Sequence, residues 1–168
     1  MAEIFQVETD EHKAHVRELY WEYIEYVRQM IVQEFGVDFE VAPIVERDMN
    51  ELYKLSPPHG RLFLIQLDDQ IAGLGGLRQI GEGIGEIKRM FVRPNFQSRG
   101  LGRRLLELLI AEARQVGYKK VRLDVGSYAE SAEKLYRSTG FSNIMPYPES
   151  EAPLEVHSKW QFMELLLQ

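Results

Sequence analysis

Cysteine is absent from the 168 residues of this sequence. Its absence excludes a disulfide framework, a thiolate metal site and a cysteine nucleophile. Long apolar runs are also missing, since none approaches the roughly 18–20 residues that a membrane-spanning helix needs. The first residues lack the basic-then-apolar pattern of a secretory leader. We therefore expect a protein without membrane association, located by default in the cytoplasm.

Histidine is scarce, with 4 residues in the whole chain. His12 and His15 share one face of a predicted helix. Two histidines without a third ligand usually belong to an ordinary helix surface rather than to a metal site. We therefore expect no bound metal.

Basic side chains are outnumbered, 20 against 26 acidic ones, and the two kinds are unevenly placed. Residues 86–104 contain six basic side chains and one acidic one, Glu86, whereas residues 1–60 contain five basic and thirteen acidic ones. A small positive region on an acidic chain fits a polyanionic small ligand better than a nucleic acid, which needs a broader basic face. The acidic N-terminal third either attracts a cationic amine substrate or forms a solvated helix surface, and the second interpretation is the more common one.

Hydrophobic periodicity predicts a mixed α/β fold in a single domain that spans residues 1–168. The expected strands are 4–7, 61–67, 71–78, 86–92, 120–125, 141–144 and 160–167, and the expected helices are 11–35, 43–55, 101–116 and 129–139. Residues 86–125 have the order strand, helix, strand, which is typical of a parallel β-α-β crossover. We expect this crossover at the centre of a mixed β-sheet flanked by helices.

The first predicted helix carries four neighbouring aromatic residues, Tyr20, Trp21, Tyr23 and Tyr26. They either line an acceptor pocket or belong to the core, which is the commoner place for aromatic residues at helical spacing. In the second predicted helix we expect Tyr53 to face inward.

Three glycines, Gly73, Gly75 and Gly76, lie within the predicted strand 71–78. No helix follows them, so they do not form a dinucleotide-binding fingerprint. In a strand, such glycines indicate a bulge or the close approach of another backbone segment.

The stretch after strand 86–92 organises the rest of the chain. Pro94 breaks the strand, Gly100 and Gly102 lie in a short loop, and a helix with an apolar stripe begins directly afterwards. A glycine-containing loop that opens a helix leaves backbone N–H groups unpaired at the positive end of the helix dipole, an arrangement that binds phosphates. Three arginines in or beside the loop add charges suited to phosphate oxygens: Arg99, Arg103 and Arg104. The alternative is a tight turn in which the glycines serve backbone geometry alone.

The run Gln97-Ser-Arg-Gly-Leu-Gly102 resembles the Gln/Arg-x-x-Gly-x-Gly/Ala signature of the GNAT acyl-CoA N-acyltransferase superfamily. The run Ala132-Glu-Lys-Leu-Tyr-Arg-Ser-Thr-Gly-Phe141 resembles a second GNAT pattern, and the resemblance covers nearly the whole chain. It implies the GNAT fold and a loop that grips the pyrophosphate of coenzyme A. The cofactor contacts that it implies, through main chain at the first three positions, are Met90, Phe91, Val92, Gln97, Ser98, Arg99, Gly100, Leu101, Gly102, Arg103 and Tyr136.

One position departs from the family pattern. The usual asparagine, three residues before Ala132, is replaced by Ala129. A side-chain hydrogen bond to the pantetheine arm is then expected from Ser127 or Ser131 instead.

The resemblance also implies a catalytic role for Tyr136, whose phenol would protonate the departing thiolate as a general acid. The alternative is an amphipathic core tyrosine. Glu86 is the expected general base, acting on the amine through a water, unless it forms an ion pair with Lys88, Arg89 or a neighbouring strand. Three other residues in loops could border the acceptor site: His59, His157 and Tyr147.

We therefore expect an N-acetyltransferase that moves an acetyl group from acetyl-CoA to a primary amine of a small molecule, amino acid or peptide. The expected protein is a monomer or homodimer and has no nucleic-acid partner. One alternative is a non-catalytic acyl-CoA-binding regulatory module of the same fold. Another is a nucleic-acid or protein-interaction domain that uses the basic region 86–104.

Overall fold

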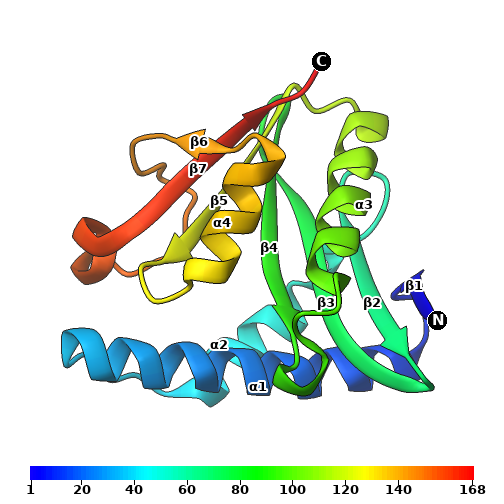
Figure 1. Cartoon of the computed structure of the whole chain (residues 1–168), viewed down its shortest axis with the longest axis horizontal. Coiled ribbons are helices and arrows are strands. Elements are labelled where there is room, and N and C mark those ends of the chain that lie inside the picture. Colours follow the sequence, from blue (N-terminus) through cyan, green and yellow to red (C-terminus); the bar gives the residue numbers. More distant parts are fainter.

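The structure, a computed structural model, describes residues 1–168 and contains a seven-stranded mixed sheet with helices on both faces (Figure 1). The strands are β1 (Ala2–Gln6), β2 (Arg61–Leu67), β3 (Gln70–Gly81), β4 (Ile84–Val92), β5 (Lys120–Gly126), β6 (Ser142–Asn143) and β7 (Trp160–Leu166). Their order in the sheet is β1-β2-β3-β4-β5-β7-β6, and only β4 and β5 are parallel. The predicted fold class, with one parallel β-α-β crossover near the centre, is confirmed.

Two layers of helices cover the sheet because strand residues alternate between its faces. On one face, α1 (Asp10–Phe35) and α2 (Val41–Asn50) pack with Leu62, Leu64 and Leu74. On the other face, α3 (Leu101–Val116) and α4 (Glu130–Thr139) pack with a second set of buried residues that includes Leu77 and Ile87. In Figure 1, α1 runs along the lower edge of the molecule, and α3 and α4 lie in front of the strands.

Local sequence accounts for the ends of α1. The Thr9 side chain accepts a hydrogen bond from the His12 backbone N–H at 3.1 Å and caps the helix. The His12 ring accepts in return from the backbone N–H groups of Glu8 and Thr9, at 3.0 and 3.3 Å. Gly36 ends the helix with φ of +68°, a conformation that glycine adopts without strain. His12 therefore serves the helix cap, and no group of three or more His, Asp or Glu side chains is placed to hold a metal ion.

The glycines of β3 allow close approach, as predicted. A Cβ atom on Gly73 would lie 2.3 Å from the backbone oxygen of Phe91, and one on Gly75 would lie 3.0 Å from the Leu109 side chain. The pairing of β3 with β4 also shifts register between Leu74 and Gly76. These glycines thus fit β3 tightly against β4 and α3 at the point where the sheet is irregular.

The prediction that Tyr53 faces inward is wrong. The α-helical part of this segment ends at Asn50, and Leu52–Leu55 forms a 3-10 turn. A 3-10 turn has three residues per turn instead of 3.6, so it rotates the side chains away from the predicted face. Tyr53 is accordingly 70% exposed, while Leu55 is buried.

The proline-rich stretch before β7 is mostly irregular, as expected, but it ends in a 3-10 helix over Leu154–Lys159. No helix in the structure combines the length and apolar character that crossing a membrane requires.

Candidate active site

A cleft opens where β4 and β5 separate. The two strands pair only over three residues each, Ile84–Glu86 with Lys120–Arg122, although β4 continues to Val92 and β5 to Gly126. Beyond Glu86, the edge of β4 that faces β5 therefore has no strand partner, and its backbone groups are available to a ligand. The resulting cleft has a volume of about 1210 Å³ and reaches from the N-terminus of α3 to α1.

A bulge in β4, at Arg89 and Met90, lies beside this cleft. Arg89 adopts φ of +57°, a left-handed conformation that costs energy in a residue other than glycine. Its guanidinium is held by the carboxylate of Asp48, with Nε to Oδ2 at 2.8 Å, and lies 3.6 Å from Glu151 Oε1. It also lies over the ring of Tyr23, 5.9 Å from the ring centroid. These contacts hold the bulge in place beside the cleft.

One end of the cleft, which we call the donor end, is formed by residues 90–103. Ser98 and Gly100 have φ of +63° and +78°, and no side chain caps the first turn of α3. The unpaired N–H groups of that turn are therefore available to an anion, and the helix dipole favours negative charge there. Arg103 lies beside them and donates a hydrogen bond to Ser138 Oγ at 3.0 Å.

The structure brings together ten of the eleven residues expected to contact the cofactor, all of which line the cleft: Met90, Phe91, Val92, Gln97, Ser98, Gly100, Leu101, Gly102, Arg103 and Tyr136. Arg99 is the exception. Its guanidinium lies over the ring of Phe96, 5.8 Å from the centroid, and its side chain is exposed outside the cleft. Arg99 is placed to contribute charge from outside the cleft rather than from its wall.

Tyr136 lies on α4 near the middle of the cleft wall and is only 7% exposed. Its ring packs against Phe141, 5.9 Å between centroids. Its hydroxyl makes no hydrogen bond to any protein atom and, since every fully buried polar side-chain atom has a partner, it is open to the cleft. Burial raises the pKa of Tyr136, and the nearby Tyr23 and Asp124 raise it further. The phenol is therefore protonated throughout the neutral pH range and is free to donate to a ligand in the cleft.

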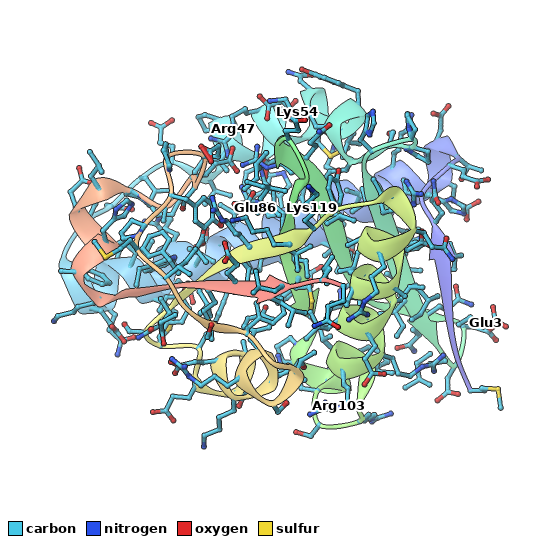
Figure 2. All side chains as sticks on the ribbon, turned by 90° about the horizontal axis from the view of Figure 1, so that it is seen from above. Glu3, Arg47, Lys54, Glu86, Arg103 and Lys119 are labelled. Carbon is cyan, nitrogen blue, oxygen red and sulfur yellow. The ribbon has the colours of Figure 1, made fainter.

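Glu86 occupies a different place from the one expected of a general base. Its carboxylate accepts from Arg78 Nε at 2.7 Å and from the Tyr147 hydroxyl at 2.7 Å, and it is 4% exposed. Burial raises the pKa of Glu86, against the opposing effects of Arg78 and Tyr147. Figure 2 shows it in the middle of the molecule, far from Arg103 at the edge. The alternative, an ion pair with a neighbouring strand, is what the structure contains, and Glu86 does not line the cleft.

Asp124 lines the cleft and was missed by the sequence analysis. Its carboxylate accepts from Ser150 Oγ at 2.7 Å and from Trp160 Nε1 at 3.1 Å, and it forms no salt bridge. The signal was present, because β5 alternates apolar residues with Lys120, Arg122 and Asp124 on its other face. What the pattern could not reveal is that β5 separates from β4 before reaching Asp124.

Two aromatic residues of α1 line the cleft, Tyr23 and Tyr26, whereas Tyr20 is 1% exposed in the core and Trp21 is 42% exposed at the surface. The aromatic run is thus divided among the cleft, the core and the surface. Tyr26 contacts Tyr128 edge-to-face at 5.8 Å between ring centroids, and Tyr128 contacts Trp160 in the same way at 5.7 Å. These rings and Asp124 form the other end of the cleft, which we call the acceptor end. His59, His157 and Tyr147 do not line it.

Comparison with known proteins identifies the family. Residues 16–141 match the sequence profile of the Acetyltransferase (GNAT) family. The chain belongs to this family. It is 31% identical over 134 residues to an uncharacterized N-acetyltransferase of Schizosaccharomyces pombe, covering 78% of this chain and 82% of that protein. It is therefore an acyl-CoA-dependent acetyltransferase.

Solved structures of GNAT acetyltransferases have the same fold. A GNAT-family acetyltransferase from Staphylococcus aureus superposes with a TM-score of 0.74 at 21% identity, over 100% of both chains. The PaiA N-acetyltransferase of Thermoplasma acidophilum, in complex with coenzyme A, superposes with a TM-score of 0.74 at 17% identity, over 99% of both chains.

The position that departs from the GNAT pattern lies in this cleft. Ala129 lines it and offers no side-chain hydrogen bond. Of the two serines expected to compensate, Ser127 donates to Glu34 Oε2 at 3.1 Å. Ser131 also lines the cleft, and its hydroxyl makes no hydrogen bond within the acetyltransferase. Ser131 is thus the better placed of the two to meet a pantetheine amide.

Proposed function

We propose that this acetyltransferase transfers the acetyl group of acetyl-CoA to a primary amine of a small molecule, amino acid or peptide bound at the acceptor end. The observation that carries the proposal is the Tyr136 hydroxyl. The residue is only 7% exposed, yet its hydroxyl has no protein partner and is open to the cleft where β4 and β5 separate. A hydroxyl in this position can donate a hydrogen bond to a bound ligand. The sulfur of the thioester fits that position.

The donor end supports the binding of coenzyme A. The uncapped N–H groups of the first turn of α3 and the side chain of Arg103 suit the pyrophosphate, because both offer positive charge and hydrogen-bond donors. The unpaired edge of β4 beyond Glu86 suits the pantetheine amides, and the hydroxyl of Ser131 adds one side-chain contact. The same backbone edge, near the Arg89 bulge, offers N–H groups to the thioester oxygen.

In the reaction, the amine nitrogen attacks the thioester carbon and the carbonyl electrons move onto oxygen, where backbone N–H groups of β4 stabilise the negative charge. The C–S bond then breaks, and sulfur leaves with the electron pair and takes one proton while nitrogen loses one. Tyr136 donates to the sulfur. Because burial makes its phenol a weak acid, we expect this donation to accompany proton loss from nitrogen rather than to precede it.

We assign proton removal from the nitrogen to Asp124, directly or through a water, in place of Glu86. Asp124 lines the cleft, its charge influences Tyr136, and it has no cationic partner. Both carboxylate oxygens of Glu86 are already engaged, by Arg78 and Tyr147. The alternative of a non-catalytic acyl-CoA-binding module is separated from this proposal by measuring binding and turnover independently.

The experiment compares Gly102→Glu with Gly102→Ala. Gly102 lines the cleft, its φ is not positive, and an added Cβ would meet only Leu135 at the ordinary contact distance of 3.7 Å, so both variants fit the fold. Saturating acetyl-CoA, at about 100 times its dissociation constant, stabilises a protein by about 2.7 kcal/mol, which raises the melting temperature by several degrees. We expect this shift in the wild type and in Gly102→Ala, and its loss in Gly102→Glu, where a carboxylate opposes the phosphates.

Thiol release from acetyl-CoA in the presence of a panel of primary amines then tests turnover. We expect release by the wild type and by Gly102→Ala. A thermal shift without thiol release from any amine would favour the non-catalytic module. Equal melting temperatures with and without acetyl-CoA would contradict the proposal as a whole.

A further inference from the structure

We infer that the acceptor of this acetyltransferase carries a second positive charge besides the attacking amine, as a linear alkyl diamine does. The inference rests on the proposed function and names the substrate class of the same cleft. It follows from the charges at the acceptor end, from the aromatic rings between them, and from the unpartnered hydroxyl that marks the reaction position.

The negative charges of the acceptor end are of two kinds. Glu22 and Glu25 line the cleft but are paired, with Arg93 at 2.6 Å and with Arg28 at 3.2 Å. Asp124 and Glu34 also line the cleft and take part in no salt bridge; their hydrogen-bond donors are the neutral groups of Ser127, Ser150 and Trp160. Glu130, in the first turn of α4, is a third carboxylate of the cleft without a salt bridge. Three carboxylates thus remain available to a cationic ligand, and Asp124 and Glu34 are the two that meet at the loop after β5.

Positive charge is not available at this end. Only two basic side chains line the whole cleft, Arg89 and Arg103. Arg103 lies at the donor end. Arg89 is held by Asp48 at 2.8 Å and lies 3.6 Å from Glu151, so its charge is already matched. A carboxylate on the acceptor would find no free cation here and would face the negative charges of Asp124 and Glu34.

Aromatic rings line the cleft beside Asp124 and Glu34. Glu34 meets Ser127, three residues along the chain from Asp124, a stretch that spans at most about 10 Å. Tyr26, Tyr128 and Trp160 line the same part of the cleft. Aromatic faces attract ammonium groups, and their flat apolar sides accommodate an alkyl chain. Asp124 and the rings are therefore placed to receive one small dication whose two charges are separated by a methylene chain.

A second observation, separate from the charges and the rings, comes from Tyr136, where the reaction is proposed to take place. Tyr136, 7% exposed, presents a hydroxyl without a protein partner to the cleft that Asp124 also lines. In the proposed reaction, the amine that reacts lies between these two residues. The second charge of the acceptor then points away from the donor end, toward Glu34 at the exposed rim.

The test uses three acceptors that share a primary amine at one end of a five-carbon chain and differ at the other end: 1,5-diaminopentane, 5-amino-1-pentanol and 5-aminopentanoate. The two equivalent amines of the diamine account for only a twofold difference in kcat/KM. Their far ends carry a positive charge, no charge and a negative charge. We expect kcat/KM to fall in that order, by roughly tenfold to hundredfold from the diamine to the alcohol, as for a hydrogen bond to a charged group. Equal or reversed values would overturn the inference while leaving the acetyltransferase activity established.

Binding of the same three compounds to the coenzyme A-bound protein, measured by calorimetry, gives a readout that does not depend on turnover. Tighter binding of the diamine than of the alcohol supports the inference, and equal affinity or no binding of the diamine contradicts it. A wild type that shows no thermal shift with acetyl-CoA would instead contradict the proposed function itself.

Glu34→Gln locates the second charge. We expect this variant to reduce the ratio of kcat/KM for the diamine to kcat/KM for the alcohol by roughly fivefold or more, mainly because KM for the diamine rises. The matched control is Glu107→Gln, which removes the same charge from an exposed position on α3 outside the cleft, where no salt bridge is made. If Glu107→Gln reduced the kcat/KM ratio of diamine to alcohol as much as Glu34→Gln did, the effect would be one of overall charge, and the role of Glu34 would be overturned.

Discussion

The two ends of the cleft are built in different ways. The donor end comes from one continuous stretch, residues 90–103, in which a strand, a glycine-containing turn and the first turn of α3 follow each other directly. The acceptor end is assembled from α1, β5, the loop after β5 and the start of β7, segments in which residues as far apart as Tyr26 and Trp160, 134 positions, come together. The first arrangement can be recognised from local sequence, whereas the second exists only after folding.

The two ends also differ in charge and in what holds them. At the donor end, backbone N–H groups and Arg103 offer positive charge to phosphates. At the acceptor end, Asp124 and Glu34 offer negative charge, and long-range ion pairs around Arg89 hold the neighbouring backbone. A cleft of opposite polarity at its two ends suits the proposed pair of an anionic donor and a cationic acceptor, because each end attracts one of them and repels the other. The following substitutions separate the contributions of the two ends.

Tyr136→Phe should have the largest effect. Removing a general acid typically lowers the rate about 10²–10⁴-fold, and the lower part of that range applies here because a thiolate is a good leaving group. We expect kcat for thiol release to fall about 10²-fold. The thermal shift with acetyl-CoA should persist, because the hydroxyl lies between the two ends rather than at the phosphate site. A variant with unchanged kcat would show that Tyr136 is only a core residue.

Asp124→Asn should follow, with a loss of about 10–10² in kcat, because the amide cannot accept the amine proton. The isosteric amide can still accept from Trp160 Nε1 through its oxygen and can donate its NH2 to Ser150 Oγ, so the fold should be maintained. Glu86→Gln is the comparison variant. If it lowered kcat more than Asp124→Asn did, with equal melting temperatures, the general base would be Glu86 after all.

Arg103→Ala should have a smaller effect, confined to the donor end. The loss of one exposed charged contact to a phosphate should raise KM for acetyl-CoA about tenfold and leave kcat nearly unchanged. The difference from the wild type should shrink at high salt, because exposed charge interactions are screened. Arg104→Ala is the control, since Arg104 lies one residue further along α3, outside the cleft, and donates to the backbone oxygen of Ala2. Equal KM increases in both variants would indicate a general effect of charge.

Glu151→Gln should have the smallest effect, a small loss of folding stability. Glu151 lies beside Arg89, whose ion pairs hold the backbone next to the cleft. Burial of the Glu151 side chain opposes its ionisation, but Lys88, Arg89 and Arg47 prevail and lower its pKa to about 2, from 4.5. A lowered pKa means that the charge stabilises the fold above pH 4.5 and that this stabilisation is lost as the pH falls toward 2. Since the side chain is 26% exposed, we expect about 1 kcal/mol after solvent screening.

Urea unfolding of the wild type and Glu151→Gln at several pH values measures this contribution. The difference in unfolding free energy should be constant from pH 7 to 4.5 and should shrink below that. A difference that is the same at pH 3 as at pH 7 would contradict the lowered pKa of Glu151.

Much of the molecule follows from local sequence. The predicted helices 11–35 and 101–116 match α1 and α3 to within one residue, because Thr9 caps the start of α1 and because Gly36 and Gly117 end the two helices in left-handed conformations. The glycines of β3 predicted the close approach of another backbone segment, and the Phe91 backbone lies against Gly73. Tyr53 shows the limit of such reasoning. Tyr53 has the sequence spacing of an inward-facing helix residue, but the α-helix ends at Asn50. The 3-10 turn that follows turns its side chain toward the surface.

The proposed catalytic residues also divide into those that local sequence predicted and those that only the folded structure revealed. Sequence by itself predicted the residues that line the donor end, because adjacent residues in a strand, turn and helix set their own geometry through backbone conformation and hydrogen bonding. Tyr136 was predicted from the second family pattern, and it lines the same cleft. Only the tertiary structure decided that Glu86 is paired with Arg78 and Tyr147, and that Asp124 faces the cleft. Whether a carboxylate is buried in an ion pair or open to a ligand depends on residues up to 61 positions away, as Tyr147 is from Glu86. Burial and charge pairing are properties of the folded chain, and no local pattern specifies them.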